Sequence, residues 1–305
     1  MHQKPALNLL PPDLIPYHFK MLVNKLLLIL LVFITMQPPS IAETVSLEIN
    51  NGLIAQADYR PGDRNKPTIL LLHGFLQTHQ FSIIQSISNE LSDNGYTILA
   101  PTLTMGINKR SQSMTCDMIQ SHKFGDHHKE LDSWVNWLKQ KGDDEVILIG
   151  HSTGALRLIS YTGQKNAPEN NITRVILISP TMPATTNKPA VLKNNLDTAY
   201  SLVKKGHTEP GKFSLAYCSE SYTSSAEAYI SYASLTEKKF FEYLKKTDIP
   251  LEIILGNNDK LIPENWYTQL KQAGANITLI EGANHFYSNG NEFDLFDAIN
   301  SIIEQ

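Results

Sequence analysis

The sequence predicts an α/β fold with a mostly parallel central sheet, flanked by helices and carrying a helical cap insertion. Short, continuous apolar runs alternate with segments whose apolar residues have helical spacing, as expected of parallel strands buried on both faces. Strands regularly separated by helices imply right-handed crossovers and a mostly parallel sheet. At about residues 181–248 the alternation is interrupted by a region rich in Tyr, Ser, Lys and Ala. We interpret this region as a mostly helical cap over the edge of the sheet.

The N-terminal part has the pattern of a signal peptide. From Met21 the sequence has a positive start with Lys20 and Lys25, an apolar segment at 26–36, and a small-x-small pattern that ends at Ala42. We therefore predict cleavage after Ala42; whether Met1 or Met21 is the true start stays open. An uncleaved anchor is the alternative, although the apolar segment is short for a span of about 30 Å.

The remaining residues, 43–305, are expected to form one α/β domain with its cap. The chain is 42% apolar and 18% charged, with a net charge of −4, which suits an ordinary globular protein. The sequence has no basic run, so a nucleic acid is not expected as a partner. We expect an exported protein, periplasmic or secreted, that contacts a membrane only through the signal segment before cleavage. Its oligomeric state is not predicted.

Export bears on the two cysteines, Cys116 and Cys218. In an oxidising compartment they could form a disulfide. Two separate, partly buried thiols are the alternative, so the pairing stays open.

The expected elements follow from local signals. Asn50-Asn51-Gly52 is a turn signal between two strands, Asp126 is a plausible N-cap, and Gly95 and Gly142 are placed to end helices. The polar segment 102–125 is a long loop of the kind that is more often functional than incidental. Strands are expected at 45–49, 53–59, 68–72, 96–100, 146–149, 173–179, 250–255 and 277–280, and helices at 80–94, 126–142, 155–161, 263–274 and 291–304.

The segment Gly150-His151-Ser152-Thr153-Gly154 joins the strand at 146–149 to the helix that follows. In a G-x-S-x-G turn the two glycines allow backbone and helix to crowd around a serine whose hydroxyl projects from the end of the strand. The N-terminus of the helix directs free N–H groups towards that hydroxyl. Ser152 is therefore the predicted nucleophile.

A carboxylate and a histidine follow two later strands. Asp259 comes just after 250–255 and His285 just after 277–280, so both are expected at the same edge of the sheet as Ser152. Histidine can remove the serine proton, and a carboxylate can fix the histidine tautomer. Asp248 and Asp294 are less suitable, because they lie before a strand and in a terminal helix. We predict Ser152, Asp259 and His285 as a catalytic triad.

With these motifs the chain resembles the α/β-hydrolase superfamily, specifically its serine esterases and lipases. The resemblance rests on LLLHGF at 70–75, GHSTG at 150–154, GNNDKLIP at 256–263 and GANHF at 282–286, and it covers almost all of the mature region. It implies that the backbone N–H groups of Phe75 and Thr153 form an oxyanion hole.

The predicted function is that of an exported serine hydrolase, most simply a carboxylic-ester hydrolase that forms an acyl-enzyme. This chemistry requires neither a metal nor an organic cofactor, and its partner is a small-molecule ester or acyl substrate. An acyltransferase or thioesterase would use the same triad. A non-catalytic binding protein that keeps the fold is a further alternative.

Other conspicuous side chains are expected to be structural. His73 should lie behind the loop that follows the strand at 68–72 and carries Phe75, called the oxyanion loop below, and His151 should lie beside the turn at 150–154. The group His122, Asp126, His127 and His128 is interpreted as a solvated helix start rather than a metal site, since no ligand cluster of fixed spacing accompanies it. The cap aromatics could line an acyl pocket or pack the cap: Tyr217, Tyr222, Tyr229, Tyr232, Phe240, Phe241 and Tyr243.

Overall fold

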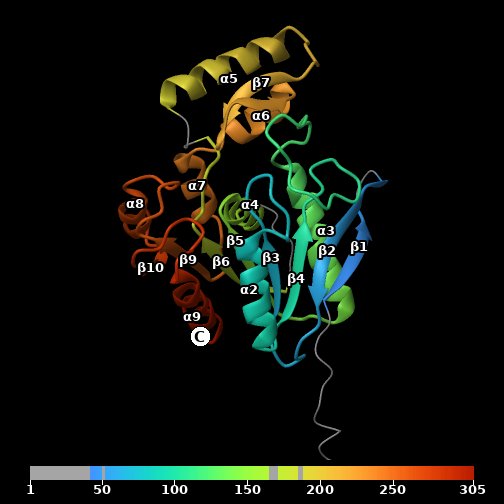
Figure 1. Ribbon diagram of the computed structural model, residues 1–305, viewed down its shortest axis with the longest axis vertical. Coiled ribbons are helices and arrows are strands. Elements are labelled where there is room, and N and C mark those ends of the chain that lie inside the picture. The colour runs from blue at the N-terminus through green and yellow to red at the C-terminus, as the bar shows by residue number, and fades with distance from the viewer. Residues whose placement is uncertain (1–41, 50–51, 165–170, 185–187) are drawn as a thin grey trace, which may run out of the picture. The chain divides into compact units, whose positions relative to one another are not determined.

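The main sheet is mixed, with an antiparallel edge on a parallel body (Figure 1). The computed structural model describes residues 42–49, 52–164, 171–184 and 188–305. Within them the sheet has eight strands in the order β1-β2-β4-β3-β5-β6-β9-β10. Strand β2 pairs antiparallel with β1 and β4, and the other neighbours are parallel. The strands are β1 (Glu43–Glu48), β2 (Ile54–Arg60), β3 (Thr68–Leu72), β4 (Thr97–Thr102), β5 (Val146–His151), β6 (Ile172–Ile178), β9 (Leu251–Gly256) and β10 (Asn276–Ile280).

Helices cover both faces of the sheet, which explains why its central strands are apolar throughout. One face packs against α2 (Ser82–Asp93) and α9 (Asn291–Ile303). The other packs against α3 (Asp126–Lys141), α4 (Thr153–Thr162) and α8 (Trp266–Gln272). Successive side chains of a strand point to opposite faces, so alternate residues of β3 and β5 enter the two apolar cores. The predicted α/β architecture is confirmed.

The cap is helical as predicted, but it also contains a two-stranded hairpin that the sequence did not predict. It contains α5 (Pro189–Lys204), α6 (Ala226–Ala233) and α7 (Glu237–Leu244), but also an antiparallel hairpin of β7 (Gly211–Leu215) and β8 (Cys218–Ser224). In Figure 1 α5, β7 and α6 lie together beyond the carboxyl ends of the central strands. The cap therefore lies over the edge of the sheet that carries the G-x-S-x-G turn at residues 150–154, called the elbow below.

The long loop between β4 and α3 is joined to the cap hairpin. Cys116 of the loop and Cys218 of β8 form a disulfide, which decides the pairing that the sequence left open. Gln120 of the loop also forms a parallel bridge with Ser224 at the end of β8. The loop is thus attached to the cap by a disulfide and by a β-bridge.

Helix boundaries agree with the expected ones to within three residues, but the predicted N-cap of α3 is wrong. Helix α3 has Gly125 as its N-cap, and Asp126 is its first residue. The Asp126 carboxylate instead accepts a hydrogen bond from the backbone N–H of Lys123. Gly142 ends the helix in a left-handed conformation, with φ 90°, a geometry that glycine adopts without steric cost.

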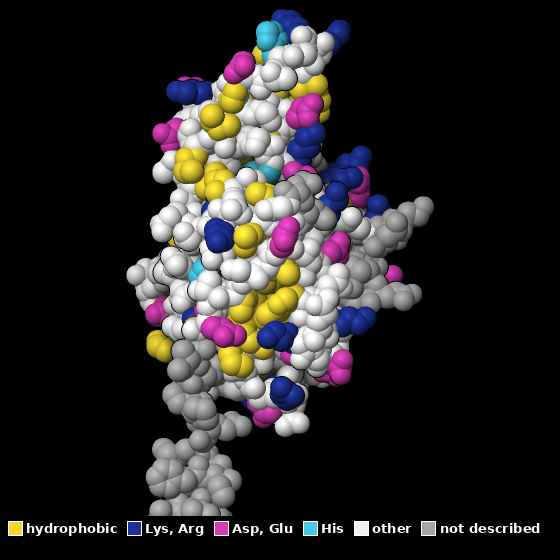
Figure 2. All heavy atoms as spheres, turned by 90° about the vertical axis from the view of Figure 1, so that its right-hand side faces the viewer, with side chains coloured by type: hydrophobic (Ala, Val, Ile, Leu, Met, Phe, Trp, Pro, Cys, Tyr) yellow, Lys and Arg dark blue, Asp and Glu magenta, His cyan; other side chains and the backbone are white. Residues whose placement is uncertain are grey.

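The predicted N-terminal extension and signal peptide span residues 1–42, of which 1–41 lie outside the described residues. Among the helices that the structure describes, none is long and apolar enough to cross a membrane. On the face beside β1, Figure 2 shows acidic and basic side chains interspersed around an apolar strip. No large field of one charge covers this visible face.

Candidate active site

The elbow places Ser152 at the end of β5 in a conformation that is unusual for a residue with a side chain. Its φ is 58° and its ψ is −125°. The flanking glycines are needed for close packing: a Cβ at Gly150 would lie 2.8 Å from the backbone nitrogen of Ala155, and one at Gly154 would lie 2.5 Å from the carbonyl oxygen of Leu72. Helix α4 can therefore start directly behind the serine only because these two positions carry no side chain.

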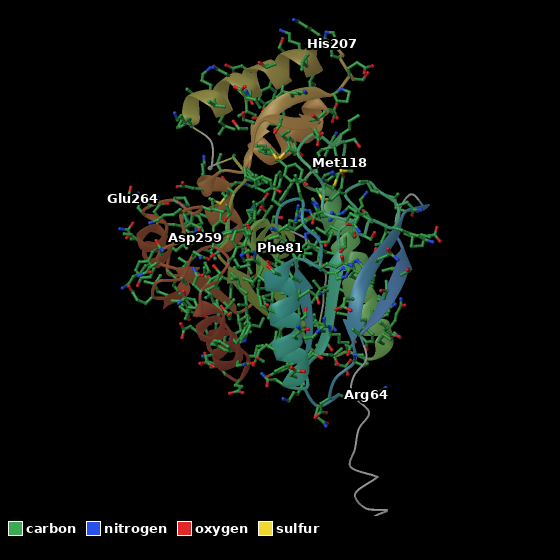
Figure 3. All side chains as sticks on the ribbon, in the orientation of Figure 1. Arg64, Phe81, Met118, His207, Asp259 and Glu264 are labelled. Carbon is green, nitrogen blue, oxygen red and sulfur yellow. A yellow bond between two sulfur atoms is a disulfide. The ribbon has the colours of Figure 1, made fainter. Side chains whose placement is uncertain are left out.

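The structure brings Ser152, His285 and Asp259 into one hydrogen-bonded chain. The Ser152 hydroxyl donates to His285 Nε2 over 2.9 Å, and His285 Nδ1 donates to Asp259 Oδ2 over 2.7 Å. Asp259 follows β9 and His285 follows β10; Figure 3 labels Asp259 on the side of the sheet that faces the cap. All three residues are buried, with Ser152 8% exposed. This tautomer leaves Nε2 free to accept the serine proton.

Asp259 is held in its charged form. Burial raises the pKa of its carboxyl group, but hydrogen bonds from His285, Leu261 and Ser179, together with the charge of His285, outweigh burial and lower the pKa below its ordinary value. The Leu261 backbone N–H donates over 2.8 Å. Ser179 follows β6, and no sequence motif indicated that its hydroxyl supports the Asp259 carboxylate.

The loop after β3 presents a backbone N–H beside the serine. In the described part of the chain, the N–H groups of Phe75 and Thr153 donate to no other protein group. Both residues line the pocket that contains Ser152. Gly74 permits the approach, since a Cβ there would lie 3.3 Å from the Cβ of Ser152 and 2.7 Å from Gln77 Oε1. These two N–H groups are the ones that the family resemblance assigns to an oxyanion hole.

Two buried arginines, which the sequence motifs did not indicate, stabilise this loop by donating hydrogen bonds to its carbonyl oxygens. Arg110 donates to the carbonyl oxygens of Gln77 over 2.7 Å and Leu103 over 2.6 Å. Arg157, from α4, donates to the carbonyl oxygens of His73 and Gly74, each over 3.4 Å. Burial and the nearby Arg157 charge lower the pKa of Arg110 to about 10, so it remains charged at neutral pH.

His73 is also part of this support. Its Nδ1 donates to the carbonyl oxygen of Gly74 over 2.9 Å, and its Nε2 accepts from the backbone N–H of Leu103 over 3.1 Å. Burial, with the charges of Arg110 and Arg157, lowers the pKa of His73 well below its ordinary value. The His73 ring is therefore neutral, and its two hydrogen bonds link Gly74 of the loop to Leu103.

Two of the four residues interpreted as a solvated helix start, His122 and His127, are not solvated, whereas Asp126 is exposed and His128 is half-buried. His122 and His127 are both buried, and His122 Nε2 lies 2.5 Å from the hydroxyl of Tyr232 in the cap. Burial, followed by the charges of Arg157 and Arg110, lowers the pKa of His122 to about 3. Within the described residues no group of three or more His, Cys, Asp or Glu side chains is arranged to hold a metal ion.

A small pocket opens beside the Ser152 hydroxyl. Its volume is about 220 Å³, and its lining is mainly apolar. Larger hollows exist. One of about 290 Å³ beside Lys66 and Asp143 lies at the opposite ends of the strands from Ser152, and one of about 550 Å³ is lined by Asp259 but not by Ser152 or His285. The pocket residues are Phe75, Gln77, Ser152, Thr153, Thr181, Pro183, Ala216, Tyr217, Leu261, His285 and Phe286.

The family model described as "Alpha/beta hydrolase family" matches residues 69–294. The chain belongs to the α/β-hydrolase family. The match runs from β3 to the start of α9 and so includes the elbow, the cap and the loops of Asp259 and His285. No curated protein matches this α/β-hydrolase in sequence.

Solved structures show the same fold at low sequence identity. Est1E from Butyrivibrio proteoclasticus is similar at 16% identity with a TM-score of 0.59, over 86% of this chain and 97% of that one. The Pyrococcus furiosus esterase PF2001 is 16% identical with a TM-score of 0.58, over 87% of this chain and 91% of the esterase. A thioesterase domain from the curacin biosynthetic pathway is 20% identical with a TM-score of 0.55, over 87% of this chain and all of that domain. These likenesses concern the α/β-hydrolase fold.

Proposed function

We propose that this protein is an exported serine hydrolase that cleaves carboxylic esters. The observation that carries the proposal is the hydrogen-bonded chain Ser152–His285–Asp259 at the mouth of a mainly apolar pocket. The Pyrococcus furiosus protein with this fold is named an esterase, which agrees with the choice of an ester. Ester cleavage needs a nucleophile, a base and donors for the oxyanion, and each has a candidate here.

The proposed reaction proceeds through an acyl-enzyme. Ser152 Oγ attacks the ester carbonyl while its proton passes to His285 Nε2, and Asp259 stabilises the imidazolium. The Phe75 and Thr153 N–H groups donate to the oxyanion that forms. His285 then gives its proton to the departing alcohol. Water, deprotonated by His285, attacks the acyl-enzyme, and the carboxylic acid is released as Ser152 recovers its proton.

A thioester is the second candidate substrate, because the same steps release a thiol in place of an alcohol. The thioesterase domain that shares the fold supports its inclusion in the tests. The Cys116–Cys218 disulfide supports export, since such bonds persist mainly in oxidising compartments.

The proposal is tested by replacing the nucleophile. We expect Ser152→Ala to lower kcat on nitrophenyl esters at least about 1,000-fold and to abolish labelling by a fluorophosphonate probe. The matched control is Ser301→Ala, an exposed serine in α9, which should retain both properties. Undiminished turnover in Ser152→Ala would exclude this mechanism, and a folded wild-type protein that ignores the probe would favour a non-catalytic role.

A further inference from the structure

The pocket beside Ser152 has one wall that comes from the cap. The cap residues Ala216 and Tyr217 lie in the turn between β7 and β8. The ring of Tyr217 meets Phe75 edge to face, with centroids 5.7 Å apart at 81°. Tyr217 is 65% exposed, whereas Tyr222, Tyr229 and Tyr232 of the cap are fully buried. Tyr217 therefore forms the outer rim of the pocket, and the other three pack the cap.

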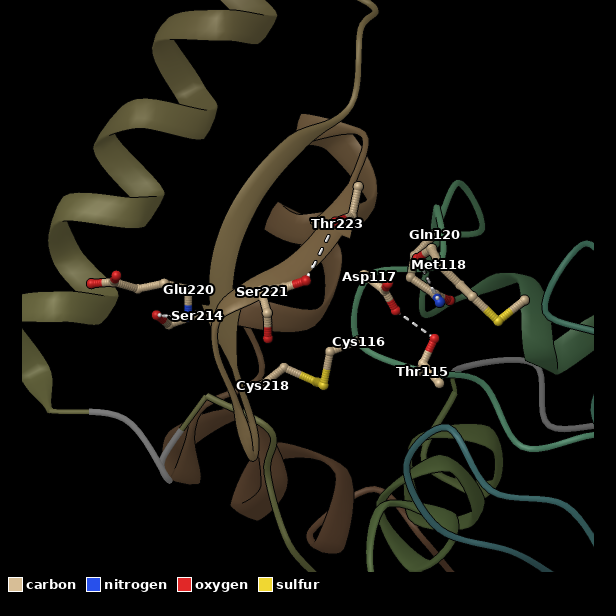
Figure 4. The surroundings of a disulfide bond; sticks show 10 residues. All are labelled: Thr115, Cys116, Asp117, Met118, Gln120, Ser214, Cys218, Glu220, Ser221 and Thr223. Carbon is tan, nitrogen blue, oxygen red and sulfur yellow. Dashed lines mark hydrogen bonds between the residues drawn. A yellow bond between two sulfur atoms is a disulfide. The ribbon is translucent and has the colours of Figure 1, made fainter.

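The turn that carries Tyr217 is fixed on both sides. The backbone N–H of Ala216 donates to the carbonyl oxygen of Pro183 over 2.8 Å, and Ala216 has a φ of 51°, which a residue with a side chain adopts only under constraint. On the other side, Cys218 is bonded to Cys116. Figure 4 shows this bond joining the hairpin to the loop at residues 115–120.

The loop at Cys116 is in turn attached to the oxyanion loop. The backbone N–H of Met114 donates to the carbonyl oxygen of Leu76 over 2.8 Å, and that of Thr223 in β8 donates to the carbonyl oxygen of Cys116 over 2.9 Å. A closed ring of contacts thus surrounds the mouth of the pocket. It runs from Phe75 and Leu76 through Met114 and Cys116, across the disulfide to Cys218 and Tyr217, and back to the Phe75 ring.

We propose that Tyr217 is the residue that limits the size of the acyl group, and that the Cys116–Cys218 disulfide holds it in that place. This inference rests on the proposed ester hydrolysis. The pocket volume of about 220 Å³ lies below the roughly 300–1,000 Å³ of pockets that hold drug-sized ligands. The preferred substrates are therefore esters of short acyl groups, and a longer chain meets the Tyr217 ring at the rim.

The first experiment compares acyl-chain preference in variants at the rim. With nitrophenyl esters from acetate to octanoate, we expect Tyr217→Ala to raise the octanoate-to-acetate ratio of kcat/KM by about tenfold or more, the range expected for steric discrimination in an apolar pocket. Tyr217→Phe keeps the ring and should keep the wild-type ratio. Tyr200→Ala is the control, since Tyr200 is a 54% exposed tyrosine on α5 outside the pocket lining. An unchanged ratio in Tyr217→Ala would overturn the assignment.

The second experiment removes the anchor and leaves the tyrosine. The double variant Cys116→Ser/Cys218→Ser should shift the ratio in the same direction as Tyr217→Ala. A dithiol reductant should do the same to the wild type: it supplies two electrons and two protons, the S–S bond becomes two thiols, and the reductant becomes a disulfide. The reductant should not affect the double variant. A double variant that is folded by circular dichroism and keeps the wild-type ratio would overturn the role of the disulfide.

The experiments distinguish a failure of the proposed ester hydrolysis from a failure of the role assigned to Tyr217. If Ser152→Ala hydrolyses esters as the wild type does, the proposed function is wrong. If hydrolysis and probe labelling require Ser152, but Tyr217→Ala changes kcat/KM equally for every chain length, only the assignment of Tyr217 is wrong.

Discussion

Ser152 carries a backbone strain that its position at the elbow imposes. A non-glycine residue with φ near 58° is disfavoured by contacts of its Cβ, at a cost of roughly 1–3 kcal/mol. The backbone N–H of Ser152 donates to the carbonyl oxygen of Ile178, and its own carbonyl oxygen accepts from Ala155. The neighbouring strand and helix therefore maintain the conformation.

Two substitutions of Ser152 should distinguish the effect of backbone strain on stability from the loss of catalysis. Both Ser152→Gly and Ser152→Ala should be inactive, but the glycine variant should have a free energy of unfolding about 1 kcal/mol higher than the alanine variant, because strain relief exceeds the extra chain entropy of glycine. Urea denaturation measures the difference. Equal stabilities, or a less stable glycine variant, would show that the turn is not strained.

Helix α4 packs against β3 at Gly154, where there is no room for a side chain. A Cβ at Gly154 would lie 2.5 Å from the carbonyl oxygen of Leu72 and 2.6 Å from that of His73. We expect Gly154→Ala to displace α4 from β3, lower the free energy of unfolding by about 1–3 kcal/mol and reduce kcat by misplacing the Thr153 N–H. Gly125→Ala is the control, because a Cβ there meets nothing within 4 Å. Wild-type kcat in Gly154→Ala would contradict this dependence.

At the level of elements, the sequence predicts those parts whose signals are local. The apolar runs predict the central strands, and the glycines of the elbow predict its tight turn, because each signal lies within a few residues. The β7–β8 hairpin could not be predicted in this way, because its turn contains Ala216 with a positive φ instead of the usual Gly or Asn. The burial of His122 depends on Tyr232, 110 residues further along the chain. Likewise, the support from Ser179 becomes visible only when β6 and β9 lie side by side.

The core as a whole should be sensitive to acid. For four buried histidines outside the triad, the pKa in the folded state lies below the ordinary 6.5, chiefly because burial disfavours the charged ring. Below pH 6.5 or so the unfolded chain binds protons that the folded chain does not, so the free energy of unfolding falls as the pH falls. Each histidine contributes up to about 1.4 kcal/mol per pH unit. The residues are His73, His122, His127 and His151.

Glu130, in the same core, acts in the opposite direction. Burial, only partly offset by hydrogen bonds from Thr104, raises the pKa of its carboxyl group from 4.5 to about 7, so between these values the folded chain binds more protons than the unfolded one. Because four histidines lower the free energy of unfolding as the pH falls and only Glu130 among these groups raises it, the net effect of acid is a loss of stability. In urea denaturation between pH 8 and pH 5, we expect Glu130→Gln to lose stability more steeply than the wild type. Identical curves would contradict the raised pKa of Glu130.

The order of the residues along the chain has a consequence for synthesis. Ser152 and His285 are separated by 133 residues, and the ribosome adds roughly 5–20 residues per second. The serine therefore leaves the ribosome on the order of 10 s before the histidine that would activate it, and β9 and β10 must join the sheet before the two meet. A partly synthesised chain carries an elbow but no base, so hydrolytic capacity would arise only once the last strands are in place.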